Sequence, residues 1–505
     1  MALSIFPYKN TLYSLLLTFL SLQLSAQIEK WDFYEVELNA EFEGNPYTEV
    51  QLSAVFQFKN RTIQLNGFYD GNNTYRIRFM PDEIGEWTYR TASNVKALNG
   101  KKGKFECKNP STNNHGPVSV KDKFQFQYAD GTPYYPVGTT CYSWTNMPEK
   151  LVSQTIETLR ENAFNKIRMC VFPKIYSIYI KNEPPYYPFK GSRKGGWDFE
   201  QFNPVFFQHL DRCIDSLRSL NIEADLILFH PYDGGHWGFD QMPDEVNNRY
   251  LRYVMARLGS YRNIWWSLSN EFEGMKSMDI EDWDRFFKII MEEDPYVHLR
   301  SIHNAIQWYD YTKPWVTHLS LQTINLTEIQ KWRNHYQKPI VVDECVYEGN
   351  IPTDWGNLTG EEMLRRCWVS YIRGGYATHG ETYMNADTVL WWSKGGKLYG
   401  KSPERIKFMR KIMEDAPQDG VVPYLSDWNK TIYLYKEQSY FLYYYGHTQQ
   451  AYADLKLPTD KKYTAEVIDT WDMTIKKLPE TFNGDTKIKL PQKPYIALRV
   501  RQVEK

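Results

Sequence analysis

Short runs in which apolar and polar residues alternate follow the N-terminal segment. The clearest are 36–42, 50–58 and 75–80, and turn residues rich in Gly, Asn, Asp and Pro separate them. A period of two places every second side chain on one face, which is the pattern of a half-buried strand. The sequence therefore predicts an N-terminal β-sandwich over residues 27–112.

Between residues 113 and 416 the pattern changes, because apolar β-branched runs alternate with amphipathic stretches of helical period. Eight β/α units fit a closed (β/α)8 TIM barrel better than an open, doubly wound sheet. The unit at 304–311 is too short for a full helix. The predicted strands are 134–139, 166–172, 222–229, 264–269, 298–303, 316–321, 340–344 and 376–382, and the predicted helices are 148–162, 204–220, 247–258, 282–291, 326–336 and 361–372.

Alternating runs return after residue 416, for example at 431–435, 440–445 and 463–469. They predict a C-terminal β-sandwich over residues 417–505. The expected fold class is therefore α/β, with a central (β/α)8 barrel between an N-terminal and a C-terminal β-sandwich.

Residues 1–26 have the pattern of a cleaved secretory signal peptide. Lys9 supplies a positive charge, residues 15–22 lie in an apolar run, and Leu24-Ser25-Ala26 ends in a small residue. No later run of about 20 apolar residues is long enough to span a membrane. We therefore expect a secreted or periplasmic protein without a membrane span.

The composition argues against several partners. Sixty basic and 61 acidic residues leave a net charge of −1, so no strong field attracts nucleic acid. Six cysteines without a C-x-x-C pair argue against a zinc site. Buried free thiols are expected, although a disulfide between Cys141 and Cys170 stays open. No glycine-rich phosphate-binding motif occurs, and we expect no cofactor.

Two predicted strands end abruptly at a glutamate. The fourth strand runs into Glu271 and the seventh into Glu344. Active sites of TIM barrels lie at the carboxyl ends of the strands, so both carboxylates are expected on one rim. Glycoside hydrolysis needs such a pair, one carboxylic acid to protonate the leaving oxygen and one carboxylate to attack the anomeric carbon.

The Asn270-Glu271 pair after the fourth strand, together with Glu344 after the seventh, resembles the clan A retaining glycoside hydrolases. The resemblance implies that Glu271 is the general acid/base, that Asn270 binds the substrate 2-hydroxyl and that Glu344 is the nucleophile. It also implies that Arg168, on the second strand, lies near the nucleophile. A positive charge there is expected to keep Glu344 ionised.

The domain order and the motifs 375–383 and 390–396 are similar to a group of bacterial secreted glycosidase-like proteins related to apiosidase-like and endoglucanase barrels. Two departures stand out. Phe272 follows the Asn-Glu pair where commoner clan members carry Pro, and Glu381 occupies the eighth strand where many carry Trp. Glu381 is therefore a candidate for substrate binding, or for replacing Glu344 as the partner of Glu271.

Further substrate contacts are predicted from residues near strand ends. The loop after the third strand contains His230, Asp233, His236 and Trp237. Hydrogen bonds from these polar groups to sugar hydroxyls, with Trp237 as a stacking platform, account for the loop better than a metal site. The other candidates are His318, Tyr347 and Trp392, followed by Tyr142, Trp144, His303 and Trp391.

These features predict a secreted glycoside hydrolase that cleaves an oligo- or polysaccharide by retaining double displacement with Glu271 and Glu344. Aromatic residues form 16% of the chain, which suits sandwich cores and also surfaces that stack on sugars. The alternative is a non-catalytic carbohydrate-binding protein that uses a barrel cleft. The paired glutamates favour the enzyme, whereas the sugar, the linkage and the oligomeric state stay open.

Overall fold

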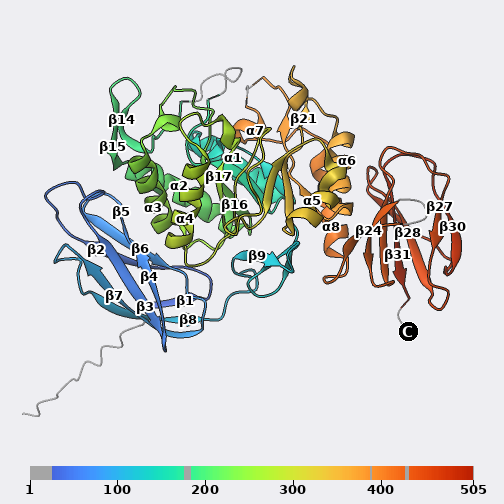
Figure 1. The fold of residues 1–505 in the computed structure, drawn as a ribbon, viewed down its shortest axis with the longest axis horizontal. Coiled ribbons are helices and arrows are strands. Elements are labelled where there is room, and N and C mark those ends of the chain that lie inside the picture. Colours follow the sequence, from blue (N-terminus) through green and yellow to red (C-terminus); the bar gives the residue numbers. More distant parts are fainter. Residues whose placement is uncertain (1–25, 176–182, 387–388, 427–430, 504–505) are drawn as a thin grey trace, which may run out of the picture.

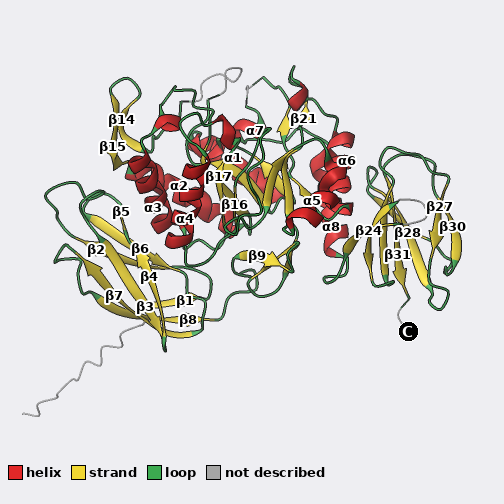
Figure 2. Cartoon of the chain, viewed as in Figure 1, coloured by secondary structure: helices red, strands yellow, loops and turns green. Residues whose placement is uncertain are grey.

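The computed structural model of the protein describes residues 26–175, 183–386, 389–426 and 431–503. Nearly all of the predicted signal peptide, residues 1–25, lies outside them. The chain forms an N-terminal β-rich part, a central part in which helices surround parallel strands, and a C-terminal β-rich part (Figure 1). The helices are confined to the central part (Figure 2). The predicted α/β class is therefore confirmed.

Two sheets pack face to face in the N-terminal part. Their strand orders are β1-β8-β7-β3-β4 and β2-β6-β5. Phe56 stacks on Phe79 of the opposite sheet with ring centroids 4.2 Å apart, and Tyr34 stacks on Phe105 at 4.1 Å. The strands are β1 (Ala26–Glu29), β2 (Tyr34–Asn39), β3 (Leu52–Phe58), β4 (Arg61–Asn66), β5 (Phe68–Tyr69), β6 (Thr74–Phe79), β7 (Gly85–Ser93) and β8 (Lys102–Lys108).

The central part contains a ring of parallel strands. Two sheets, ordered β12-β13-β16-β17-β18 and β19-β20-β22, are joined at both ends by the parallel bridges His303–Ser320 and Thr139–His379. Nearly every residue of these strands is buried, as expected for a parallel sheet covered on both faces. The strands are β12 (Gly138–Thr140), β13 (Lys166–Cys170), β16 (Glu223–Phe229), β17 (Ile264–Ser269), β18 (Arg300–Ser301), β19 (Leu319–Gln322), β20 (Ile340–Glu344) and β22 (Tyr376–Ala377).

Helices follow most of these strands and form the outer layer. The second helix, Pro204–Ser219, begins with Pro204 in its first turn. The Asn203 side chain caps it by accepting a hydrogen bond from the Val205 amide. As the sequence predicts, no helix lies between β18 and β19, where every residue is described. The helices are α1 (Glu149–Glu161), α2 (Pro204–Ser219), α3 (Asp244–Leu258), α4 (Ile280–Glu293), α5 (Ile329–Tyr336), α6 (Gly360–Ile372), α7 (Trp391–Lys394) and α8 (Ser402–Glu414).

A small sheet covers the end of the ring opposite the glutamates. It consists of β9 (Val118–Lys121), β10 (Gln125–Tyr128) and β11 (Pro133–Tyr134). Phe126 packs against Trp265 and Tyr376, with centroids 5.1 and 5.9 Å apart. The predicted first barrel strand, 134–139, is therefore split, because its first residue belongs to this sheet and the ring strand starts at Gly138.

Two short strand pairs lie at the other rim of the ring, which carries Glu271 and Glu344. A hairpin of β14 (Phe189–Ser192) and β15 (Gly196–Phe202) is inserted between β13 and α2, and β21 (Glu348–Gly349) pairs with β23 (Glu381–Thr382). Short 3-10 helices complete the loops: η1 (Trp144–Asn146), η2 (Phe239–Gln241), η3 (Phe272–Gly274), η4 (Leu326–Glu328) and η5 (Asp354–Gly356).

The C-terminal part again has two sheets around one apolar core, ordered β24-β25-β26-β31-β28-β29 and β27-β30. Leu455 and Ile488 of the small sheet share that core with Phe441 and Leu498 of the large one. The strands are β24 (Val422–Leu425), β25 (Ile432–Lys436), β26 (Tyr440–Tyr444), β27 (Tyr452–Lys456), β28 (Tyr463–Asp469), β29 (Thr474–Lys477), β30 (Asp485–Lys489) and β31 (Ile496–Gln502).

All six cysteines are described, buried and unpaired. The expectation of buried free thiols is therefore confirmed, and the disulfide considered between Cys141 and Cys170 is absent. Among the described residues, none of the helices combines the length and the apolar character needed to cross a membrane.

Buried ion pairs join the N-terminal sheets to the central part. Arg78 of β6 and Arg257 of α3 both bind the carboxylate of Asp211 on α2, at 3.0 and 2.7 Å. Arg257 also contacts Asp70 at 2.8 Å. Since all four side chains are buried, loss of one carboxylate leaves a positive charge without its main partner.

We therefore predict that Asp211→Ala lowers the free energy of unfolding by about 3–5 kcal/mol. The matched control is Asp215→Ala on the same helix, because Asp215 forms a half-exposed pair with Arg218 and is expected to cost less than about 1 kcal/mol. Chemical denaturation followed by tryptophan fluorescence measures both. Equal stability of the two variants would contradict this role of the buried pairs.

Candidate active site

Glu271 and Glu344 lie on the same rim of the strand ring. Glu344 ends β20, Glu271 follows β17, and Gln322 ends β19. With its amide nitrogen facing the carboxylates, Gln322 lies 3.1 Å from Glu271 Oε1 and 3.0 Å from Glu344 Oε2. These two oxygens are therefore at most about 6 Å apart, a spacing compatible with the carboxyl pair of a retaining glycosidase.

Several hydrogen-bond donors surround the Glu344 carboxylate, which is 3% exposed. Asn270 donates to Oε1 at 3.3 Å, Trp355 donates to Oε2 at 3.2 Å, and the Tyr142 hydroxyl donates to Oε1. His303 Nε2 lies 3.6 Å from Oε1. These groups fix the orientation of the carboxylate.

The expected role of Arg168 is wrong in one respect. Its guanidinium is held by Asp225 and Asp343 at 3.3 and 3.6 Å and donates to Asn270 Oδ1 at 2.7 Å. It thus positions Asn270 and does not pair with Glu344. Burial raises the pKa of Glu344 to about 7, and the nearby Tyr347 hydroxyl and Trp355 indole only partly oppose this rise.

The backbone is strained on both sides of the site. Glu271 has φ +44° and ψ +57°, and Val346 has φ +70°, a region that β-branched residues rarely enter. The turn at Glu271 directs the next amide, that of Phe272, to the carbonyl of His303 at 3.0 Å. Proline at position 272 would lack this donor, which accounts for the departure from the commoner pattern.

A buried lysine that the sequence analysis missed forms part of the wall. The Lys174 ammonium lies 3.6 Å from the ring centroid of Tyr232 and 3.9 Å from that of Tyr142, with Trp392 at 5.2 Å. Burial lowers its pKa to about 8, while the charge of Glu271 acts in the opposite direction. The only signal in the sequence for this role was that Lys174 lies four residues after the end of β13.

Three further predicted contacts gather around Glu344. Asn270 also donates to the Tyr232 hydroxyl at 2.7 Å, which holds its amide plane. The rings of Tyr347 and Trp392 lie 5.6 Å apart, and Trp392 is half-buried beside the site. Gly380 is needed for this packing, because a Cβ atom there would lie 2.0 Å from the Tyr347 ring.

The loop after β16 does not supply the predicted sugar contacts. Trp237 is 3% exposed and donates to Glu183 at 3.1 Å, so it offers no open face for stacking. His236 binds the same Glu183 at 2.7 Å. His230 is buried against the carbonyl of Phe172 at 3.2 Å, and burial lowers its pKa to about 4. The Asp233 carboxylate instead accepts three backbone amides of the loop.

His318 is also placed wrongly by the prediction. It precedes β19, so it lies at the opposite end of the ring, against Trp265 and Phe126 with centroids 5.2 and 5.9 Å apart. Burial lowers its pKa to about 4. Trp144 and Trp391 are fully buried as well and serve packing.

Glu381 does not join Glu271. It lies beyond the ring strand, paired in register with Glu348, and its carboxylate accepts the amides of Tyr399 and Gly400 at 2.6 and 2.9 Å. The Glu348 carboxylate accepts the next two amides, 401 and 402. Burial raises the pKa of Glu381 to about 8, and Glu348 adds to this. The pair therefore anchors the start of α8.

Within the described part of the chain, Glu348, His379 and Glu381 are the only group close enough to hold a metal ion, with ligand atoms within 4.8 Å of one another. Four backbone amides already direct positive partial charge at these carboxylates. These hydrogen bonds satisfy both carboxylates within the protein, so the group is accounted for by its anchoring of the start of α8.

The comparisons with known proteins agree with this geometry. Residues 120–443 match the model of the apiosidase-like catalytic domain, and residues 27–94 and 428–501 match two domains of unknown function, DUF5060 and DUF5605. A comparison with functionally curated proteins gives no match.

Solved structures of similar fold include a protein from Bacteroides vulgatus provisionally assigned as a glycoside hydrolase. It is 41% identical, with a TM-score of 0.90 over 95% of this chain and 100% of that chain. A family 5 glycoside hydrolase from the same species is 17% identical, with a TM-score of 0.62 over 77% of this chain and 94% of its own. The second likeness shows the fold alone. The chain therefore belongs to the apiosidase-like family, and its central part is a glycoside hydrolase catalytic domain.

Proposed function

We propose that the protein is a secreted retaining glycoside hydrolase whose ring of strands is a (β/α)8 barrel of the clan A type. The observation that carries the proposal is the shared contact of Glu271 and Glu344 with the Gln322 amide. Inverting enzymes need about 6.5–9.5 Å between the carboxyl groups to admit a water molecule, and one amide that contacts both carboxylates favours the shorter spacing, about 5–5.5 Å, of retaining enzymes.

In the first step the Glu344 carboxylate attacks the anomeric carbon while Glu271 donates its proton to the leaving oxygen. The glycosidic bond breaks as the bond to Glu344 forms. In the second step Glu271 takes a proton from water, the resulting hydroxide attacks the same carbon, and Glu344 leaves. Two displacements restore the original configuration.

Neighbouring residues prepare both steps. Arg168 fixes the Asn270 amide, whose Nδ2 reaches Glu344 Oε1 at 3.3 Å and is placed to contact the sugar 2-hydroxyl. Because Tyr142 and Trp355 bond opposite oxygens of Glu344, the carboxylate is oriented before substrate binds. Trp392 supplies an aromatic surface for stacking beside Lys174.

The proposed substrate class is an oligo- or polysaccharide, and the signal-like pattern of residues 1–26 supports a reaction outside the cytoplasm. The two flanking pairs of sheets are proposed to be β-sandwiches that brace the barrel. No cofactor takes part in the proposed reaction, because the two carboxyl groups supply both the proton and the nucleophile.

We predict that Glu344→Gly abolishes hydrolysis and that added azide restores turnover of an activated aryl glycoside, giving a glycosyl azide of inverted configuration. The anion occupies the space of the lost carboxylate and attacks from the same face. Glu381→Gly is the control, since Glu381 contacts backbone amides and is expected to show no rescue. Rescue at Glu381 alone would transfer the nucleophile to the eighth strand.

The pH dependence offers a second test. Only ionised Glu344 can attack, and its pKa is raised to about 7, so kcat/KM is expected to fall as the pH drops through about 7. Trp355→Phe removes a donor to the carboxylate, which raises this pKa further and moves the acid limb to higher pH. An acid limb near pH 4–5, unchanged by Trp355→Phe, would contradict the assignment.

A further inference from the structure

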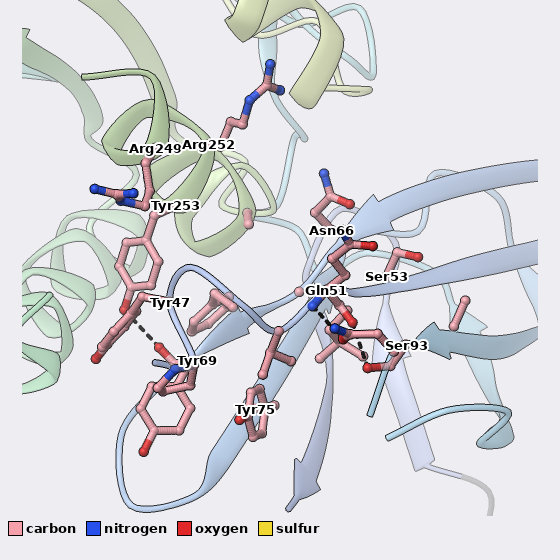
Figure 3. Close-up of a pocket in the computed structure, with 18 of the residues that line it drawn as sticks. Tyr47, Gln51, Ser53, Asn66, Tyr69, Tyr75, Ser93, Arg249, Arg252 and Tyr253 are labelled. Carbon is pink, nitrogen blue, oxygen red and sulfur yellow. Dashed lines mark hydrogen bonds between the residues drawn. The ribbon is translucent and has the colours of Figure 1, made fainter. Parts of the chain in front are cut away.

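A large groove lies between the N-terminal sheets and helix α3 and shares no residue with the active site. Its volume is about 1030 Å³, and Figure 3 shows residues that line it. A second hollow of about 500 Å³ continues from it along the β14–β15 hairpin, and Tyr47, Tyr69 and Phe202 line both. Their shared lining residues show that the two hollows adjoin.

Polar, uncharged side chains dominate one wall of the groove. Gln51 immediately precedes β3, Ser53 belongs to β3, and Gln64 and Asn66 come from β4. Gln64 and Asn66 are exposed on the same face of their strand, since they are two residues apart. Amides and hydroxyls of this kind both donate and accept hydrogen bonds, as sugar hydroxyls require.

Helix α3 forms the opposite wall, with Arg249, Arg252 and Tyr253 (Figure 3). The charge of Arg252 is balanced by Glu293, which also accepts a hydrogen bond from Asn66 at 2.7 Å. The half-buried Arg249 binds the carbonyl of Phe199 at 3.3 Å, while its buried Nε has no partner among the described residues. Together with Glu293, the lining residue Glu245 offsets the two arginine charges, so this wall carries donors with little net charge.

The tyrosines in the groove pack against neighbouring aromatic rings. Tyr47 packs edge-on against Tyr69, Phe202 and Tyr253, with centroids 5.1, 5.4 and 5.9 Å apart. The Tyr253 hydroxyl donates to the carbonyl of Tyr69 at 3.1 Å, which ties helix α3 to the sheets. Preformed walls reduce the ordering cost of binding, and tyrosine combines an apolar ring with a polar tip.

From this lining we infer that the groove between the N-terminal sheets and α3 is a second carbohydrate site, which binds a neutral stretch of the polysaccharide substrate without cleaving it. The inference rests on the carbohydrate substrate of the proposed function. A neutral chain fits because amides, hydroxyls and tyrosines face it and the arginine charge is offset. Cleavage does not occur there, because Glu245 is the only carboxylate that lines either hollow among the described residues.

The test is affinity electrophoresis of the full chain in native gels containing galactomannan, xyloglucan or arabinoxylan. Each protein carries Glu344→Gln, so that the polymer is not cleaved. The groove variant is Gln64→Ala with Asn66→Ala, and the matched control is Thr62→Ala, an exposed residue on the same face of β4 that does not line the groove. Melting curves check that all three are folded.

We expect at least one polymer to retard the parent protein, the groove variant to bind it at least tenfold more weakly, and Thr62→Ala to match the parent. With Glu344 restored in both proteins, the groove variant should turn over aryl glycosides at the same rate as the protein with an unaltered groove. Equal retardation of groove variant and parent, or no retardation of the parent by any of the three polymers, would overturn the inference. Retardation without any aryl glycoside turnover would instead count against the proposed function alone.

Discussion

Four buried charges inside the strand ring support the chemistry above them. Lys166 binds Asp225 and Asp343 at 2.6 and 2.7 Å, and Arg168 lies 3.3 and 3.6 Å from the same carboxylates. The network is balanced, with two positive and two negative groups, and Lys166 and Arg168 hold the pKa of Asp343 well below its usual range although burial acts against this. Removal of any member would leave an unpaired charge in the interior, which is strongly destabilising. Arg168 connects this network to the active site, because it donates a hydrogen bond of 2.7 Å to the side chain of Asn270.

The same rigidity explains why strained backbone persists at the site. Glu271 and Val346 both have positive φ, which costs on the order of 1–3 kcal/mol each. Such conformations survive only where the surroundings determine them. Here the amide after Glu271 bonds His303, and Gln322 reaches Glu271 and Glu344 from a third strand. Strain, hydrogen bonds and the charge network thus hold two carboxylates at a short spacing that their mutual repulsion would otherwise oppose.

Much of this arrangement was predictable from the sequence, because apolar strands that stop at a polar residue mark a rim. Glu271 and Glu344 were found in that way. Gln322 carried the same signal, yet an amide has no acid or base chemistry to draw attention to it. His318 was misplaced because periodicity does not define which residue begins a strand, and a shift of a few residues moved it to the opposite end of the ring. Trp237 was misplaced because loop residues have no periodicity that indicates burial.

Glu381 illustrates a different limit. It follows a ring strand in the sequence, but the chain leaves the ring after His379, and a two-residue strand takes Glu381 to Glu348. The backbone amides that bind both carboxylates come from residues 399–402, which no local pattern connects with them. Long-range contacts of this kind decide whether a strand-end carboxylate reaches the cleft or becomes part of the scaffold.

The central claim is that Glu271 and Glu344 act by two successive displacements. The most direct test is the anomeric configuration of the product first released from an aryl glycoside of known configuration, followed by ¹H NMR before mutarotation. The spacing set by Gln322 predicts that the first-formed sugar has the same configuration as the substrate. Release of the opposite anomer would show a single displacement by water and contradict the account.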